Sequence, residues 1–186
     1  MHKIDSFIRE SQRMHPLSNS KWNPPSFVDR TTQLFLALMS RVALSDFTFS
    51  NGTTIPQGTT VAASTYQVHF NDKVYEDPLI FDGFRFSRMR ERSSKNVGMV
   101  STSPDQLSFG HGRQVCPGRY FAACELKLMF AHIVLTYDVK LEIEGVRPPD
   151  MWIMTSCFAN PNANVLFRKR TNGQVLWWCK YAWVRG

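Results

Sequence analysis

Apolar residues recur at helical spacing in two stretches of the chain. Residues 2–14 are predicted to form a helix that stops at His15, because the residue before a proline is pushed out of the helical region. The apolar face of this helix holds Ile4, Phe7, Ile8 and Met14. Residues 118–136 are predicted to form the longest helix, since they carry one broad apolar face and no internal proline or glycine.

Shorter apolar runs bounded by turn signals predict strands. Residues 42–49 and 59–66 are the first two, and Asn51-Gly52 supplies a hairpin turn after the first of them. Further strands are predicted at 139–143, 151–156 and 164–168, of which the last two are expected to pair as a hairpin.

Other segments lack a clear period. Residues 17–30 are polar and are predicted to be a loop, and the apolar run at 34–39 is of ambiguous type. Residues 69–80 are expected to be a short helix or turn, and 81–108 a long irregular, charged segment. Long ordered loops inside a domain are usually functional.

The composition is that of one modest globular domain. The 186 residues are 43% hydrophobic and 20% charged, and the net charge is +7. Part of that charge is a basic cluster, opposed only by Glu91, which holds Arg85, Arg88, Arg90, Arg92 and Lys95. The cluster fits either a solvated loop or an acidic protein, anionic lipid or nucleic acid; the last ranks lowest, because no nucleic-acid module signature is visible.

The cysteines and the hydropathy narrow the protein class. Four cysteines form neither a CxxC pair nor a Cys/His zinc spacing, and they are too sparse for a disulfide scaffold, so a reducing compartment fits better. No secretory leader is expected after Met1, and no run of eighteen apolar residues predicts a spanning helix.

Cys116 is the residue with the clearest chemistry. It lies just before the long predicted helix and is surrounded by Gly110, Gly112, Pro117 and Gly118. Glycines let the backbone approach a planar ligand closely, and N–H groups at a helix start favour an anionic thiolate. Without its neighbours, a lone cysteine would be interpreted as a small buried residue.

The run Phe-Gly-His-Gly-Arg-Gln-Val-Cys-Pro-Gly at 109–118 resembles the haem-binding loop of the cytochrome P450 family. The family pattern is matched at Phe109, Gly112, Cys116 and Gly118. The resemblance implies that Cys116 is the axial ligand of the haem iron. One position departs from the pattern, because Gln114 stands where the family uses a basic residue to pair with a haem propionate, and Arg113 is one residue away.

Two further motifs occur in the family's order. Glu10-Ser-Gln-Arg13 resembles the Glu-x-x-Arg motif, and Arg85, in Phe-Arg-Phe, resembles the family's later second arginine. The resemblance implies a buried network of Glu10, Arg13 and Arg85, in which one carboxylate accepts bonds from two guanidinium groups. Arg41 and His69 stand at positions that the resemblance places near a propionate; their alternatives are an ordinary strand end and an ordinary turn.

The resemblance, which is strongest to fungal microsomal members, implies a mainly α fold with a small β region, the C-terminal portion of the cytochrome P450 fold. It also implies haem b (iron protoporphyrin IX), a small apolar organic substrate, oxygen insertion with O2 and two electrons, and electrons from NADPH through a flavoprotein reductase. Basic residues expected to contact that reductase are Arg88, Arg90, Arg92, Lys95, Arg119 and Lys127. A full-length relative is expected on the cytoplasmic face of the endoplasmic reticulum membrane.

The chain is expected to carry only part of such an enzyme. Residues 1–170 correspond to the C-terminal part of the domain, which leaves the oxygen-activating helix and most of the substrate pocket outside it. Residues 18–35 are predicted to be an insertion, either a retained intron or a surface loop, and 171–186 an atypical aromatic tail. The alternative function is therefore a truncated, non-catalytic remnant that binds haem weakly or not at all.

Overall fold

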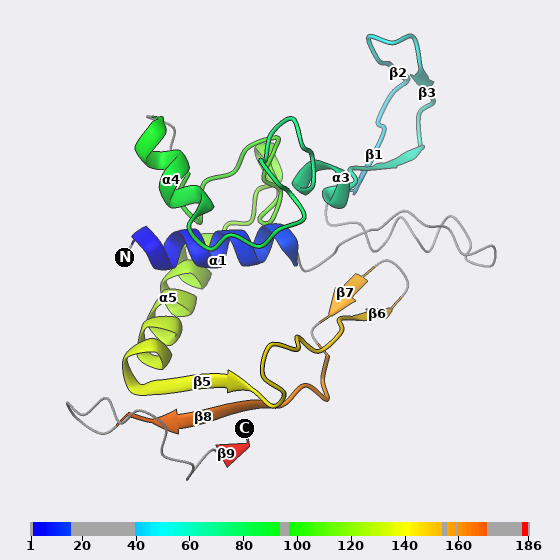
Figure 1. The fold of residues 1–186 in the computed structure, drawn as a ribbon. Helices are drawn as coiled ribbons and strands as arrows, with labels where there is room; N and C mark the ends of the chain where they lie inside the picture. Colours follow the sequence, from blue (N-terminus) through cyan, green and yellow to red (C-terminus); the bar gives the residue numbers. More distant parts are fainter. Residues whose placement is uncertain are drawn as a thin grey trace.

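Two long helices cross the centre of the molecule, and short elements surround them (Figure 1). The computed structural model describes residues 2–15, 40–93, 97–153, 156–158, 160–170 and 184–185. Its helices are α1 (His2–Met14), α3 (Thr65–His69), α4 (Arg85–Arg92) and α5 (Arg119–Thr136), with a 3-10 turn, η1, at Gly112–Gln114.

The strands among the described residues form four small antiparallel sheets. The first two sheets pair β1 (Ser40–Val42) with β4 (Thr60–Ala62), and β2 (Phe47–Thr48) with β3 (Thr54–Ile55). The other two join β5 (Tyr137–Leu141), β8 (Val165–Lys169) and β9 (Val184–Arg185), and separately β6 (Met151–Ile153) and β7 (Ser156–Phe158).

The predicted hairpin at Asn51-Gly52 is confirmed. It joins β2 to β3 with Phe47 opposite Ile55, and it projects from the rest of the molecule (Figure 1). The φ of Gly52 is +85°, a left-handed value that a side chain would disfavour. Asn51 Oδ1 accepts a hydrogen bond from the backbone N–H of Thr53 at 3.0 Å, which closes the turn from within.

The two long helices are confirmed, whereas several predicted strands are wrong in extent. Residues 42–49 are split between β1 and β2, and β4 ends at Ala62. After β4, Ser64 caps α3 by accepting a hydrogen bond from the N–H of Gln67, so a helix stands where the strand was expected to continue.

Two further predictions are corrected. The segment 81–108 contains the helix α4, whose apolar face consists of Phe86 and Met89. Two apolar residues three positions apart are too short a pattern to predict a helix. The predicted hairpin of 151–156 with 164–168 does not form: β6 pairs with β7, and β8 pairs with β5. Long-range pairing of this kind is decided by tertiary packing rather than by local sequence.

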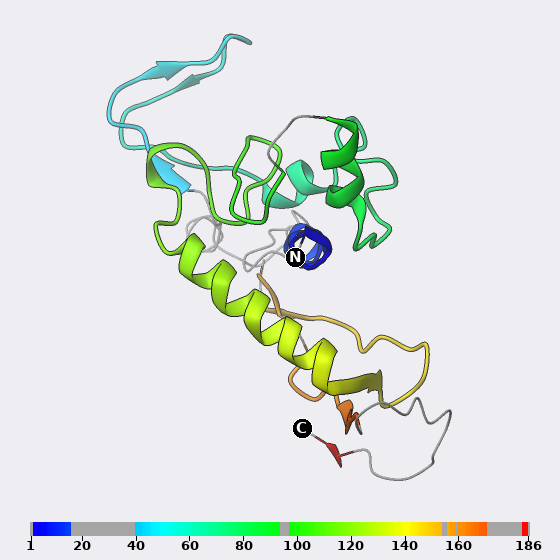
Figure 2. The ribbon, with the colours of Figure 1, turned by 90° about the vertical axis from the view of Figure 1, so that its left-hand side faces the viewer.

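The core lies where α1 packs between α4 and α5 (Figures 1 and 2). It is built from buried Ile8, Met99 and Ala123, against which Phe109 and Phe130 pack. Seen along the axis of α1, α5 runs from the cysteine loop (residues 109–118) out to β5 (Figure 2). Among the described residues, no helix is both long and apolar enough to cross a bilayer.

Some predictions concern residues that are not described. The loop at 17–30, the apolar run at 34–39 and the insertion at 18–35 all lie outside the described ranges. Of the tail 171–186, only β9 is described.

Candidate functional site

The cysteine loop is a tight turn closed by backbone hydrogen bonds. Cys116 N–H donates to Phe109 O at 2.9 Å, so the two ends of the loop meet. Gly110 and Gly112 have φ values of +73° and +76°, the left-handed conformation that glycine adopts without steric cost. Phe109 is half-buried against the core, while Cys116 is exposed. The loop therefore holds a free thiol at the surface on a backbone anchored in the core.

The sulfur of Cys116 lies beside the start of α5. A Cβ placed on Gly118 would meet Cys116 Sγ at 4.0 Å. Gly118 is the N-cap residue and supplies no side-chain acceptor, and the N–H of Arg119 donates to Cys116 O at 3.5 Å. Arg119 Nη1 donates to Cys116 O at 2.9 Å, which adds a positive charge to this end of the helix. Both features make this end of the helix electropositive.

Glu10, Arg13 and Arg85 form one buried cluster. Arg13 donates through Nε and Nη2 to the two oxygens of Glu10, each at 2.8 Å. Arg85 Nε donates to Glu10 Oε1 at 3.1 Å, and so does the backbone N–H of Asp82. Glu10 and Arg13 are fully buried. The structure thus brings the three predicted network residues together around one carboxylate.

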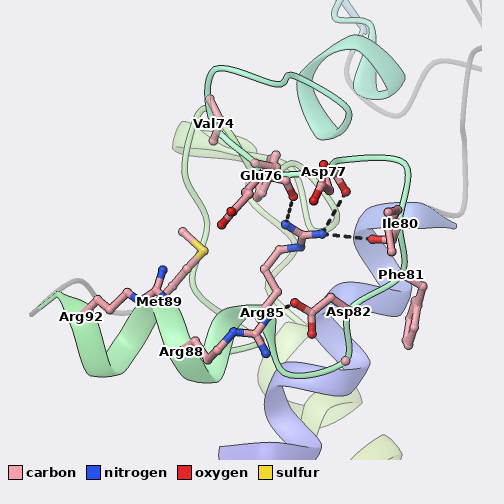
Figure 3. Close-up of a pocket in the computed structure, with 12 residues that line it drawn as sticks. Val74, Glu76, Asp77, Ile80, Phe81, Asp82, Arg85, Arg88, Met89 and Arg92 are labelled. Carbon is pink, nitrogen blue, oxygen red and sulfur yellow. Dashed lines mark hydrogen bonds and ion pairs between the residues drawn. The ribbon is translucent and has the colours of Figure 1, made fainter.

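Arg85 also binds a turn of the preceding chain. Its Nη2 donates to Asp77 O at 3.2 Å and to Ile80 O at 3.0 Å, and its Nη1 donates to Glu76 O. These bonds form one wall of a pocket of about 590 Å³ (Figure 3). Arg85 therefore joins the turn at 76–80 to α1, and most of its donors are already used.

Sequence reasoning missed a row of buried charges on α1. Asp5, Arg9 and Arg13 are spaced four residues apart, so they lie on one face of the helix, and all three are buried. Asp5 accepts a hydrogen bond from Met99 N–H at 2.9 Å, and Arg9 donates to Ser101 O at 3.0 Å and to Gly98 O. Burial lowers the pKa of Arg9 to about 10. The four-residue repeat of charges was the available signal, although exposed helix faces often show it too.

His69 is buried, and both of its ring nitrogens are bonded within the protein. Nδ1 donates to Arg13 O at 3.0 Å, and Nε2 accepts from Leu107 N–H at 2.9 Å. Burial is the main cause that lowers the pKa of His69 to about 4, so the ring is neutral near pH 7. In this arrangement, neither nitrogen is available to a propionate.

The other predicted propionate residues are exposed. Arg41 lies on β1 and donates to Ser40 O at 2.6 Å. Gln114 and Arg113 lie on η1 and project from the cysteine loop. None of the described hydrogen bonds joins Arg41 to that loop. These polar groups are accessible to a ligand, but none of the described hydrogen bonds brings them together at one point.

Similar proteins show to which family the chain belongs. Residues 30–167 match the cytochrome P450 family model. A cytochrome P450 monooxygenase of Postia placenta, number 151, is 46% identical over 172 residues, which cover 91% of this chain and 31% of that protein. The chain belongs to the cytochrome P450 family.

Other family members are likewise about three times as long as the segment that matches this chain. The P450 monooxygenase CYP512U6 of Ganoderma lucidum is 35% identical over 177 residues, which cover 94% of this chain and 31% of that protein. The P450 monooxygenase janQ of Penicillium janthinellum is 37% identical over 172 residues, which cover 91% of this chain and 31% of that protein. The chain spans about a third of the length of the curated relatives it matches. The predicted similarity to fungal members is confirmed.

Solved P450 structures share this fold. A retinoic acid-bound cyanobacterial CYP120A1 superposes with a TM-score of 0.64 at 22% identity, over 90% of this chain and 33% of that one. The haem domain of cytochrome P450DA gives a TM-score of 0.64 at 20% identity, over 90% and 31%. The predicted fold class, a partial P450 fold of helices and short strands, is confirmed.

The residues of the cysteine loop fit the haem that the family implies. The thiol of Cys116 is exposed beside the start of α5, and nothing lies within 4 Å of a Cβ placed on Gly112. A planar group can therefore approach this backbone. Over the part of the chain that is described, no three His, Cys, Asp or Glu side chains gather to hold a metal ion by themselves.

Most of the predicted reductase contacts already have partners in the protein. Arg88 pairs with Asp82, and Lys127 pairs with Asp5. Arg90 is bonded to His2, and Arg119 to the cysteine loop. Arg92 is exposed on the last turn of α4, and Lys95 lies outside the described residues.

Proposed function

We propose that Cys116 is the axial thiolate ligand of a haem iron, and that the protein acts as a haem-thiolate monooxygenase on a small apolar organic substrate. The exposed thiol at the uncapped start of α5 carries this proposal. Haem bound there supplies oxygen insertion with O2 and two electrons, and a cysteine ligand donates electron density that favours O–O cleavage.

This chain's own residues would hold and orient the group. Phe109 anchors the loop in the core, while Gly112 and Gly118 keep the backbone free of side chains near the sulfur. Arg41 and Gln114 are exposed and would bind the haem propionates. Arg41 would form an ion pair, and Gln114 would donate a neutral hydrogen bond. Glu10, Arg13 and Arg85 would hold the scaffold behind the loop rather than contact the haem.

Electrons would come from NADPH through an acidic flavoprotein reductase. Exposed Arg92 on the last turn of α4 supports this proposal, because charge complementarity speeds the encounter of two proteins. We further propose that the parent enzyme works on the cytoplasmic face of the endoplasmic reticulum membrane, as the resemblance to fungal microsomal members implies.

The alternative function is a non-catalytic remnant that binds haem weakly or not at all. One observation favours it: large apolar side chains of α5 are exposed in this chain. They are Tyr120, Phe121, Leu126, Leu128, Met129, Val134 and Leu135. An enzyme has to exclude water from its reacting centre. The exposed apolar face of α5 is open to water in this chain.

A difference spectrum of the reduced, carbon monoxide-treated chain loaded with haem tests thiolate ligation. Cys116→Ser is the test variant and Cys124→Ser the matched control, because both thiols are exposed and free. We expect a thiolate-type Soret band in the wild type and in Cys124→Ser, and none in Cys116→Ser. A thiolate-type band that survives in Cys116→Ser would refute the assignment.

Turnover distinguishes the enzyme from the remnant. The haem-loaded chain is supplied with NADPH, a fungal reductase and a panel of apolar substrates, and hydroxylated products are measured. Product formation that depends on Cys116 supports the monooxygenase. A thiolate-type band without any product supports the remnant.

A further inference from the structure

We propose that His69 is a positioning residue for the cysteine loop. Its imidazole fixes Leu107, which lies just before the loop, to the C-terminal end of α1. The inference rests on the proposed function only in taking the loop's ligand to be haem. His69 would not contact the haem itself.

His69 and Arg13 are linked in both directions. Arg13 Nη1 donates to His69 O at 2.7 Å, and His69 Nδ1 donates back to Arg13 O at 3.0 Å. Arg13 is in turn held by Glu10. The position of the imidazole is therefore set by the buried ion cluster rather than by α3 alone, which is only five residues long.

The opposite edge of the ring holds the loop. Nε2 of His69 accepts the backbone N–H of Leu107 at 2.9 Å, and Leu107 O then accepts from Gly110 N–H at 2.8 Å. Gly110 follows Phe109, whose carbonyl accepts from Cys116 N–H. A short series of hydrogen bonds thus runs from the ion cluster through His69 to the backbone of the cysteine.

A neutral histidine is well suited to this position. The ring has to donate at one edge and accept at the other, and a neutral imidazole does both. Protonation would turn Nε2 into a donor that faces the N–H of Leu107, and burial beside Arg13 and Arg9 opposes it.

Neighbouring bonds hold the same segment more weakly or further from the cysteine. Tyr75 Oη donates to Asp105 O at 2.7 Å, and Ser108 Oγ lies 3.4 Å from Gln12 O. Asp105 is two residues before Leu107 and five before Gly110. Loss of the His69 bond therefore frees the backbone at Leu107, which is closer to Phe109 than Asp105 is.

The experiment compares His69→Phe, which removes both ring bonds, with His69→Gln, which keeps an acceptor toward Leu107. Thr65→Val is the matched control, because Thr65 is equally buried on α3 and its hydroxyl has no partner among the described contacts. The first readout needs no haem: amide exchange at Leu107 and Gly110, with the alkylation rate of Cys116 relative to Cys124. The second is the share of thiolate-type Soret band in the haem-loaded, reduced, carbon monoxide-treated chain.

For His69→Phe we expect exchange at Leu107 and alkylation of Cys116 to rise about fivefold, the factor that one lost hydrogen bond corresponds to. The thiolate-type share should fall in the same variant. His69→Gln should restore both, and Thr65→Val should change neither. Equal loop exchange and an equal thiolate-type share in His69→Phe and wild type would overturn the proposal.

Two outcomes keep this proposal separate from the function. A wild-type chain that binds no haem would refute the proposed function, and the haem-free readouts would still decide the role of His69. Where His69→Phe does not fold, His69→Asn replaces it, because its amide keeps the donor toward Arg13 and loses the acceptor toward Leu107. Loop exchange as slow in His69→Asn as in His69→Gln would then refute the positioning role.

Discussion

Arg13 and Glu10 form a two-point ion pair in the core, in which Nε and Nη2 of Arg13 each donate at 2.8 Å to a different oxygen of Glu10. Neither side chain is exposed to solvent. Their i, i+3 spacing places them together on α1, but Arg85 reaches the same carboxylate only through the tertiary fold. A buried pair of this kind fixes geometry more than it adds net stability, and it is costly to break.

Glu10→Ala should therefore lower the free energy of unfolding by about 3–5 kcal/mol, because it leaves two buried guanidinium groups without their carboxylate. Urea denaturation measures the change. Glu125→Ala is the control: Glu125 is exposed on α5, and its loss should change stability by less than about 0.5 kcal/mol. Similar changes in the two variants would contradict a structural role for the Glu10 cluster.

Stability should depend on pH through His69. Its pKa is lowered from 6.5 to about 4 by burial, so the unfolded chain binds the proton more readily than the folded one. The contribution of neutral His69 is complete above pH 6.5 and is lost as the pH falls toward 4, by about 3 kcal/mol in total. Denaturation curves between pH 7 and pH 4 measure this loss.

The control for that prediction is His69→Gln, which does not titrate in this range. The fall in stability between pH 6.5 and pH 4 should be smaller in the variant by the His69 contribution. The pKa of His15 is also lowered by burial, and this residue contributes equally to both proteins. Parallel pH profiles for the two proteins would show that His69 is not buried as described.

Gly83 allows a close approach between α1 and the start of α4. A Cβ at this position would lie 2.7 Å from Phe7 Cδ2, closer than two carbon atoms can pack. Gly83→Ala should therefore cost about 1–3 kcal/mol of stability. Phe7→Leu should remove most of that cost, so a double-mutant cycle measured by urea denaturation should give a favourable coupling energy. Additive effects would place the clash elsewhere.

Haem should protect one exposed thiol and leave the other reactive. Cys116 and Cys124 are both exposed, but only Cys116 lies in the cysteine loop. With free haem at about 100 times its Kd, alkylation of Cys116 should slow about a hundredfold, because only the unbound fraction reacts. Site-resolved mass spectrometry after iodoacetamide treatment measures both rates. Protection of Cys124 to the same degree would indicate nonspecific adsorption of haem.

Local sequence was sufficient where the physical signal is local. The periodicity of residues 2–14 predicted α1, a long run without glycine or proline predicted α5, and Asn51-Gly52 predicted the β2–β3 turn. It was insufficient for α4, a short arginine-rich helix in which Arg85 and Phe86 are buried against other segments. The pairing of β8 with β5 likewise depends on residues far apart in the chain.

The sequence by itself determined the chemistry that is available: a cysteine among glycines before a helix, and a carboxylate three residues from an arginine. These properties follow from covalent order and helical spacing. Only the tertiary structure decided which side of α1 is buried, because Asp5, Arg9 and Arg13 gain backbone partners there that their spacing could not reveal. It also decided that His69 lies between Arg13 and Leu107. An imidazole has a hydrogen-bonding atom on each of two edges, and only the fold determines which groups those atoms contact.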